Sequence, residues 1–328
     1  MTWAAHTGPV TVHGDGMPGL IELLGRGPAL VLTGAGISTD SGIPDYRGPD
    51  GTRRVTPMSH GEFVTSASAR QRYWARSYAG WSRFGAAAPN AGHRALTHLQ
   101  AQGWVGPIIT QNVDGLHQGA GSREVIDLHG VLGEVVCLDC AGRFDRVVVQ
   151  SWIEAANQGF VERVRRSTLP GSRVSAQIRP DGDVVLDDQL VAAFEVPRCP
   201  VCEGDRLKPD VVFFGGSVPK ERVNRCYELT DRAPGLLVIG SSLSVMSGLR
   251  FVKRAAQRGI PIAIVTKGPT RGDELASVRL DAPITPVLVA LTRALSLGAP
   301  VSGWADPLDP AQDGSYLSQD GGVVAVDR

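Results

Sequence analysis

The chain has 328 residues, of which 42% are hydrophobic, and its 33 basic and 33 acidic residues give a formal net charge of zero. This length accommodates a large and a small lobe, each with a buried core. Balanced charge provides no global field for nucleic acid or an anionic membrane, so neither is an expected partner. The sequence has no run of about 18 apolar residues, and its start lacks the features of a secretory signal. We therefore expect a cytoplasmic protein.

Short apolar segments that end in Gly, Ser or Thr recur along the chain, separated by stretches of helical length. They occupy residues 29–32, 107–109, 236–239 and 261–265. Such segments are typical of buried parallel strands with functional loops at their carboxyl ends. The expected fold class is therefore α/β, with a doubly wound, Rossmann-like parallel sheet that binds ligands at its carboxyl edge.

Amphipathic stretches and their end signals predict helices between these strands. They cover residues 19–25, 63–84, 90–103, 148–157 and 249–258. We assign residues 19–48, 105–135 and 208–292 to the nucleotide-binding domain, 49–104 to a cofactor loop and the helical part of the small lobe, and 136–207 to a zinc-binding module. Residues 1–18 and 304–328 are expected to be flexible termini, with one weak strand at 323–326.

The glycine-rich segment 33–42 follows the first predicted strand. Its small residues allow backbone N–H groups and a helix start to approach a pyrophosphate. A dehydrogenase fingerprint would need a third glycine where Thr39 stands and an acidic residue at the end of the next strand, and neither is present. The pattern alone is equally compatible with a tight turn. The polar loop that follows, with Asp45, Tyr46 and Arg47, favours the nucleotide interpretation because it can close over a bound ligand.

Polar side chains follow the second predicted strand. Gln111, Asn112 and Asp114 would be directed into the crevice, where an amide and a carboxylate can hold a ribose hydroxyl and a carboxamide. The alternative is an ordinary Asx-capped turn. His129 ends the apolar run 125–128 and is the best general-base candidate, since the pKa of an imidazole lies near neutrality. An ordinary core or surface histidine is the alternative for His129, and His117 is its only near rival as the base.

Four of the five cysteines form two Cys-x-x-Cys pairs, Cys137 with Cys140 and Cys199 with Cys202. In a reducing compartment such pairs are metal ligands or redox centres more often than disulfides. Four thiolates give Zn²⁺ a closed tetrahedral shell, which predicts a structural ion remote from catalysis. Cys226 stands alone and is expected to be buried in a helix.

Taken together, the motifs stand in a distinctive order between residues 20 and 290: Gly-Ala-Gly-Ile-Ser at 34–38, Gly-Ile-Pro-Asp-Tyr-Arg at 42–47, Thr-Gln-Asn-Val-Asp at 110–114, Leu-His-Gly at 128–130, the two cysteine pairs, Lys-Pro-Asp-Val-Val-Phe-Phe-Gly at 208–215 and Gly-Ser-Ser at 240–242. In this order they resemble the sirtuins, a family of NAD-dependent protein-lysine deacylases. Residues 70–76 and 268–271 are similar to the class II branch, which includes the mitochondrial lipoamidase-type sirtuin.

The resemblance implies a role for each catalytic candidate. His129 would draw a proton from a ribose hydroxyl of NAD, Asn112 would order the ribose and a water, and Asp114 would hold the nicotinamide carboxamide. The acyl-lysine oxygen would attack the ribose, giving nicotinamide, deacylated lysine and O-acyl-ADP-ribose. Because the substrate would supply the nucleophile, the protein would need none of its own, which explains why we identify no Ser/His/Asp or Cys/His arrangement in the sequence.

The resemblance also implies the binding residues. NAD would contact Gly34, Ala35, Gly36, Ile37, Asp45, Tyr46, Arg47, Gln111, Asn112, Val113, Asp114, Gly240, Ser241, Ser242, Thr266, Lys267, Gly268 and Ile284. The substrate peptide would dock as a strand on Val211, Val212, Phe213, Phe214 and Gly215, although this run also fits a buried strand. Many sirtuins have Phe at Tyr46 and Asn at Thr266, which puts a direct adenosine contact from Thr266 in doubt. Arg53 and Arg54 are candidates for binding an acidic acyl group, or a solvated pair.

The leading hypothesis is therefore an NAD-dependent protein-lysine deacylase that uses NAD as cosubstrate, one structural Zn²⁺ and acyl-lysine proteins as partners. Mono-ADP-ribosyl transfer to a protein is the second enzymatic interpretation, because it uses the same activation of NAD. A non-catalytic NAD-binding scaffold is the third. The sequence does not identify the preferred acyl group.

Overall fold

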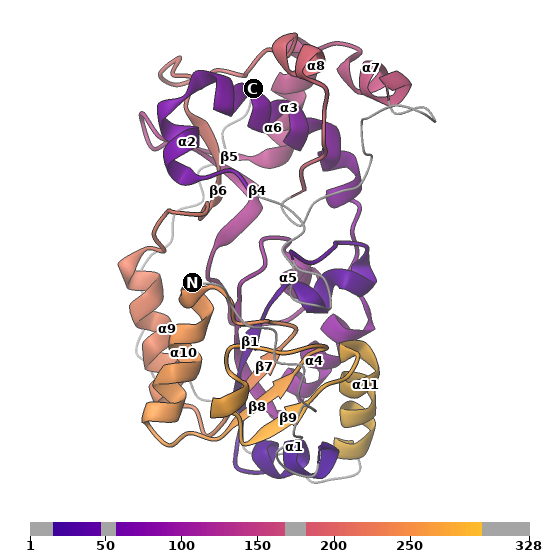
Figure 1. Ribbon diagram of the computed structural model, residues 1–328, viewed down its shortest axis with the longest axis vertical. Helices are drawn as coiled ribbons and strands as arrows, with labels where there is room; N and C mark the ends of the chain where they lie inside the picture. The colour runs from indigo at the N-terminus through magenta and orange to yellow at the C-terminus, as the bar shows by residue number, and fades with distance from the viewer. Residues whose placement is uncertain (1–15, 47–56, 168–181, 297–328) are drawn as a thin grey trace, which may run out of the picture.

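The structure is a computed structural model that describes residues 16–46, 57–167 and 182–296. These residues form two lobes stacked along the long axis of the molecule (Figure 1). The larger lobe contains a parallel sheet and the smaller one contains a short antiparallel sheet with helices packed on it. The predicted α/β fold class is confirmed. Within the described ranges, no helix has both the length and the apolar character needed to cross a membrane.

The parallel sheet has six strands among the described residues, in the order β3-β2-β1-β7-β8-β9. Their bounds are β1 Ala29–Thr33, β2 Val105–Thr110, β3 Val125–Asp127, β7 Leu236–Ile239, β8 Ile262–Val265 and β9 Val278–Leu280. The strand order reverses between β1 and β7, and the helices α4 and α10 that follow in the chain cover opposite faces of the sheet, an arrangement that places a ligand crevice at the carboxyl edge. The predicted glycine motif and the Gly-Ser-Ser motif are the loops after β1 and β7.

Alternation of side chains along each strand creates two apolar cores. In β1, Ala29 and Val31 face one core, whereas Leu30 and Leu32 face the other. Helices α1 (Met17–Leu24), α4 (Ala91–Ala101) and α11 (Ile284–Leu295) cover the first face, and α9 (Lys220–Arg232) and α10 (Met246–Gln257) cover the second. Both faces of the sheet are thus buried, which explains why its strands are continuously apolar in sequence.

The smaller lobe is built around an antiparallel sheet in which β4 lies between β5 and β6. Its elements are β4 Gly130–Cys137, β5 Arg143–Asp145, β6 Leu207–Val211, α2 His60–Thr65, α3 Ala67–Phe84, α6 Arg146–Ala156, α7 Phe160–Ser167 and α8 Asp188–Ala192. Phe63, Tyr73, Trp74 and Phe160 are buried in its core. The short elements η1 (Ala35–Ser41), α5 (Leu116–Gly119) and η2 (Asp273–Leu275) complete the chain.

Several predicted boundaries differ from the structure. The helix predicted at 63–84 is broken at Ser66, whose Oγ accepts the Ala69 N–H at 3.2 Å and caps α3. Helix α4, grouped with the small lobe, packs on β2 and α11 of the large lobe. Strand β6 and most of β4 were both grouped with the large lobe, but they pair with each other in the sheet of the small lobe. Helix α1 starts at Met17, within the predicted flexible terminus. The predicted tail and its strand at 323–326 lie outside the described residues.

Candidate active site

The loops after β1 and β7 are packed directly against each other. The Gly36 N–H donates to the Gly240 carbonyl oxygen at 2.9 Å. A Cβ atom added at Gly36 would lie 2.9 Å from the Gly240 Cα, and one added at Gly34 would lie 2.8 Å from the Ser241 Cβ. These distances are too short for any real Cβ, so contact between the two loops requires both glycines. The sequence interpretation considered pyrophosphate approach or a tight turn and missed this structural requirement.

A cavity of about 1240 Å³ opens at this edge, and residues of both lobes line it. Typical small-molecule pockets hold roughly 300–1,000 Å³, so this cavity has room for a dinucleotide and part of a second ligand. Its wall includes the glycine loops on one side and Tyr73, Leu132 and Phe213 on the other. Tyr46 contacts Phe214 edge to face, with ring centroids 6.1 Å apart, and so connects the predicted cofactor loop to the predicted substrate segment.

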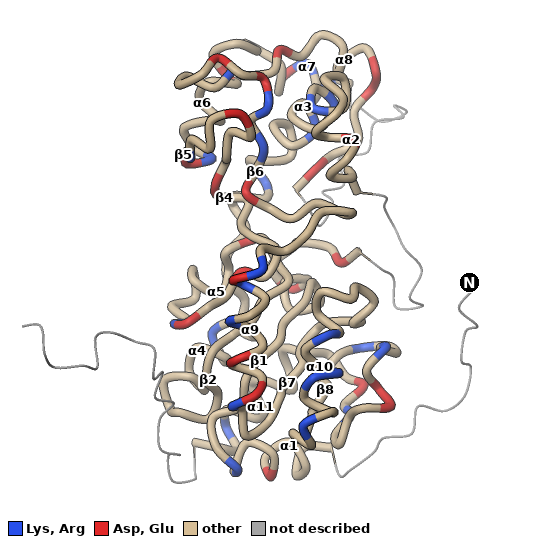
Figure 2. Tube along the Cα trace, turned by 90° about the vertical axis from the view of Figure 1, so that its left-hand side faces the viewer, with Lys and Arg blue, Asp and Glu red and all other residues tan. Residues whose placement is uncertain are grey.

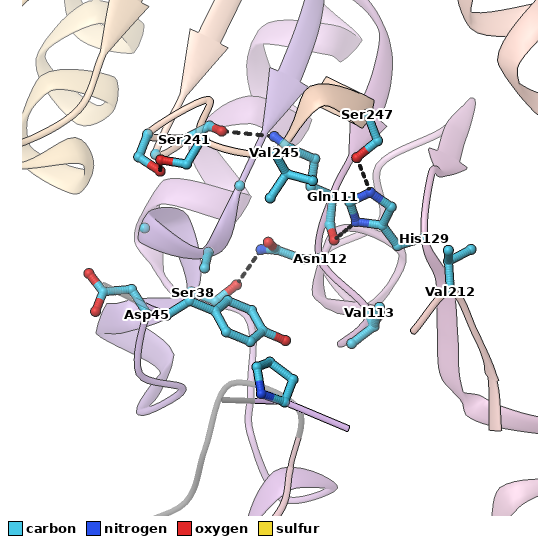
Figure 3. Close-up of a pocket in the computed structure, with 18 of the residues that line it drawn as sticks. Ser38, Asp45, Gln111, Asn112, Val113, His129, Val212, Ser241, Val245 and Ser247 are labelled. Atoms are coloured by element: carbon cyan, nitrogen blue, oxygen red, sulfur yellow. Dashed lines mark hydrogen bonds between the residues drawn. The ribbon is translucent and has the colours of Figure 1, made fainter. Parts of the chain in front are cut away.

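His129 lies on the cavity wall with both ring nitrogens in hydrogen bonds (Figure 3). Its Nδ1 is 2.8 Å from the Gln111 carbonyl oxygen, and its Nε2 is 2.8 Å from the Ser247 Oγ. A carbonyl oxygen only accepts, so Nδ1 carries the proton and the Nε2 lone pair accepts from the Ser247 hydroxyl. Burial lowers the pKa of His129, and the charges of Arg222 and Arg250 lower it further against the opposing Gln111 bond. The imidazole is therefore neutral near pH 7, as a general base must be.

Ser38 joins the two polar residues that follow β2. Its Oγ donates to the Asp114 Oδ2 at 2.7 Å and accepts from the Asn112 Nδ2 at 3.0 Å. The other carboxylate oxygen of Asp114 accepts the Leu116 N–H at 3.0 Å. Asp114 thus makes the Asx turn foreseen as the alternative and also lines the cavity. Burial raises the pKa of Asp114, although these hydrogen bonds oppose the shift.

The segment 266–268 is held in the cavity wall by a buried arginine. Arg279 is 1% exposed, and its Nη1 donates to the Thr266 carbonyl at 2.9 Å while its Nε bonds Asp273 at 2.9 Å. Its Nη2 donates to the Gly268 carbonyl. Arg279 therefore orders the loop that carries Thr266, Lys267 and Gly268. The sequence analysis missed it, and the available signal was a lone arginine in an apolar strand.

The predicted substrate segment is partly incorporated into the fold. Val211 pairs with Gly130 at the end of β6, and the Val212 N–H donates to the His129 carbonyl at 2.7 Å. The Phe214 carbonyl accepts the His60 N–H at 2.8 Å. Beneath the segment, the buried Lys208 ammonium donates to the Val211 carbonyl. These bonds fix the segment directly beside the proposed base.

All but two of the predicted NAD-binding and substrate residues line the cavity. Ile37 is 1% exposed and packs in the core below the sheet edge, because its side chain points away from the crevice. Arg47, like Arg53 and Arg54, lies outside the described residues. The rival base His117 is buried and is hydrogen bonded to the Thr33 hydroxyl at 3.0 Å. Burial, with a smaller effect of His93, lowers the pKa of His117 to about 3, which makes it a structural histidine.

The four paired cysteines come together in the small lobe. The Sγ atoms of Cys137 and Cys202 are 3.6 Å apart, those of Cys140 and Cys199 are 3.7 Å apart, and all four lie within 4.8 Å of one another. Zinc–sulfur bonds of about 2.3 Å in a tetrahedron give sulfur separations of about 3.8 Å, so the cluster could hold a structural zinc. Strand β4 places Cys137 roughly 25 Å from His129 at the usual rise per residue. Cys226 is fully buried in α9.

A doubly wound sheet with this cavity at its carboxyl edge, a neutral histidine in the wall and a four-cysteine cluster that could hold a structural metal is typical of a nucleotide-dependent α/β enzyme. A sequence profile of the Sir2 family matches residues 34–247. The chain belongs to this family, the sirtuins, which use NAD as a cosubstrate.

Three bacterial relatives support the assignment. The NAD-dependent protein deacetylase 1 of Streptomyces coelicolor is 51% identical over 84% of this chain and 89% of its own length. NAD-dependent protein deacetylase 1 of Mycobacterium avium is 48% identical over 88% of this chain and 98% of its own. NAD-dependent protein deacetylase 3 of Pseudomonas syringae is 48% identical over 81% of this chain and 91% of its own length.

Solved Sir2 structures share the fold. One Sir2 enzyme superposes with a TM-score of 0.65 at 30% identity, covering 86% of this chain and 98% of that chain. A Sir2 complex with p53 peptide and NAD⁺ superposes with a TM-score of 0.64 at 28% identity, covering 87% of this chain and 100% of that chain.

Proposed function

We propose that this protein is an NAD-dependent protein-lysine deacetylase whose reaction extends to other acyl groups and yields nicotinamide, free lysine and O-acyl-ADP-ribose. The names of the bacterial relatives support the deacetylase activity. The observation that carries the proposal is the position of His129. Its neutral imidazole lies in the wall of a dinucleotide-sized cavity, and its own carbonyl binds the Val212 N–H of the segment expected to dock the peptide.

In the proposed mechanism, bound NAD supplies an electrophilic ribose carbon and a nicotinamide leaving group. His129 accepts a proton at Nε2 from a ribose hydroxyl, and the Gln111 carbonyl keeps the ring in the required tautomer. Asn112 and Asp114, held by Ser38, bind the ribose and the carboxamide. The apolar wall beside the base excludes water from the reacting carbon.

We further propose that the chain belongs to the class II branch and accepts acyl groups larger than acetyl. Support comes from the stretches 70–76 and 268–271 and from the apolar residues Met58, Tyr73 and Phe213 in the cavity wall. Within those stretches, Arg70 donates to the Phe63 carbonyl at 3.0 Å and to Asp205 at 2.7 Å. Arg70 therefore acts as a framework residue, and acyl selection is assigned to the cavity wall.

The test is release of nicotinamide from NAD with acetyl-, succinyl-, methylglutaryl-, lipoyl- and long-chain acyl-lysine peptides. We expect release that requires peptide and is lost in His129→Ala, which should still bind NAD. Transfer of labelled ADP-ribose to protein without acyl-ADP-ribose would instead support mono-ADP-ribosyl transfer.

Ser247→Ala is the matched control, because Ser247 and His129 form a serine–histidine pair that the sequence analysis did not anticipate. Turnover in Ser247→Ala should persist, since the substrate oxygen is the nucleophile. If Ser247→Ala lost turnover as completely as His129→Ala does, the result would point to a serine nucleophile and would refute the mechanism.

A further inference from the structure

The cavity wall next to His129 and Val212 includes residues from the first turns of α9 and α10, which pack against each other. Lys220 is the first residue of α9, and Arg250 lies about one turn after Ser247 on α10. Both side chains line the cavity. Helix α10 has no acidic residue, and Figure 2 marks the basic positions along it in blue.

Lys220 and Arg250 differ from Arg254 and Arg258, two arginines farther along α10 that are paired with a carboxylate. Arg254 donates to both carboxylate oxygens of Asp231 at 2.7 Å, and Arg258 lies 3.4 Å from the same group. No carboxylate of the described chain forms an ion pair with Lys220 or Arg250. The hydrogen bond of Arg250 is a long one of 3.4 Å to the Met246 carbonyl in its own helix.

The acidic residues of the cavity come from other elements. Asp40, Asp45 and Asp114 follow β1 and β2, and Figure 3 places Asp45 across the cavity from Ser247. The wall formed by α9 and α10 is therefore positive. Arg250 already acts on His129, since its charge contributes to lowering the pKa of that imidazole. A carboxylate supplied by a ligand would neutralise this wall.

We propose that Lys220 and Arg250 bind the carboxylate of an Asp or Glu that flanks the acyl-lysine in the protein substrate. The inference rests on the proposed function, because it takes the segment beside Val212 as the place where the peptide docks. A carboxylate on the acyl group itself is the other source of the same chemistry. The flanking residue fits better, because Lys220 is exposed at the rim whereas the wall around His129 contains the apolar Leu132 and Phe213.

The experiment compares binding of fluorescein-labelled acetyl-lysine peptides that differ only in carrying Glu or Gln within three residues of the acetyl-lysine. Binding to the full chain with NAD is measured by polarisation, and nicotinamide release is followed in parallel. Exposed ion pairs contribute about 0.2–1 kcal/mol each, so two such pairs should make the Glu peptide bind about 2- to 30-fold more tightly, and less so at high salt. A succinyl-lysine peptide flanked by Gln tests the other source of the carboxylate.

The Lys220→Gln/Arg250→Gln double variant should bind both acetyl peptides equally. Lys253→Gln is the matched control, because Lys253 is an exposed cation on α10 that does not line the cavity. Arg250→Glu should reverse the preference toward a Lys-flanked peptide, which excludes simple misfolding.

Equal binding of the Glu and Gln peptides to the unmodified protein, or a preference that persists in the double variant, overturns the proposal. A preference for succinyl-lysine alone overturns the flanking assignment. If the protein bound the Glu peptide more tightly than the Gln peptide but released no nicotinamide, deacetylation would be refuted and the carboxylate site would be supported.

Discussion

Gly240 and Gly259 provide a matched pair for testing whether contact between the two cavity loops is required. Both have left-handed backbone, with φ of 64° at Gly240 and 68° at Gly259. A Cβ atom at Gly240 would lie 2.6 Å from the Ile37 nitrogen and 2.9 Å from the Gly36 carbonyl carbon, whereas one at Gly259 would have no atom within 4 Å. Substitution by alanine therefore adds the same backbone strain at both positions and a steric clash at only one.

The structure sets the expected magnitudes. An alanine in the left-handed region costs about 1–2 kcal/mol, which is the full effect expected for Gly259→Ala. Overpacking adds about 1–3 kcal/mol when the neighbours are backbone atoms that cannot rotate away, so Gly240→Ala should lose about 2–5 kcal/mol. With about 2–4 °C of melting temperature per kcal/mol, the two variants should differ by about 2–12 °C.

The assay is thermal unfolding of both variants with and without NAD. NAD should raise the melting temperature of Gly259→Ala as it does for the unmodified protein, and should raise that of Gly240→Ala less, because the displaced loop lines the cavity. Equal melting temperatures for the two variants would refute the reasoning, since they would show that the loops separate without cost.

Three further predictions test the metal site, the buried histidines and Ser38. Zinc chelation or Cys199→Ser should unfold the small lobe, and an unchanged melting temperature after metal removal would contradict a structural role. Burial lowers the pKa of His93 to about 4 and that of His117 to about 3. The unfolded chain, with histidine pKa values near 6.5, therefore binds more protons, so stability is complete above that pH and falls as the pH decreases toward 4 and 3. The free energy of unfolding, measured in denaturant titrations, should fall by about 2 kcal/mol per histidine between neutral pH and pH 5. In His93→Gln this free energy should depend less steeply on pH, and an equal pH dependence in the variant and the unmodified protein would contradict the prediction. Ser38→Ala removes two hydrogen bonds within the site and should lower kcat/KM by about tenfold or more. The control is Ser151→Ala, because Ser151 is an exposed serine of α6 that does not line the cavity. Equal kcat/KM values for the two variants would show that the Ser38 bonds do not position the site.

Much of the large lobe follows from local sequence signals. Strand β7 has the predicted bounds, and the other predicted strands differ from the structure by one or two residues, because each is a continuous apolar run that ends in a small residue. The helix break at Ser66 was also readable, since serine is a favoured N-cap. The placement of α4 was not readable, because both lobes offer an apolar surface to an amphipathic helix.

The site was predictable where a single loop supplies the chemistry and not where distant segments meet. The His129 and Asn112 motifs were recognisable because each lies at a strand end. The contact between His129 and Ser247 joins residues 118 positions apart, and it exists only because α10 begins at the same sheet edge. Arg279 acts on Thr266 through backbone carbonyls, and no local pattern encodes that contact.

The pairing of β4 with β6 connects the cysteine cluster to the proposed base. At one end Cys137 pairs with Leu207 beside the cysteine cluster, and at the other Gly130 pairs with Val211 beside His129. A Cβ atom at Gly130 would lie 1.9 Å from the Asp210 carbonyl oxygen, so only glycine permits the strands to meet there. A slip of one residue would turn every side chain of β6 to the opposite face and displace the proposed substrate segment that follows. The cysteine cluster lies beside the end of this pairing that is remote from His129, and a register shift between Gly130 and Val135 separates the two ends, so the geometry of the proposed peptide site depends on the close approach at Gly130 as well.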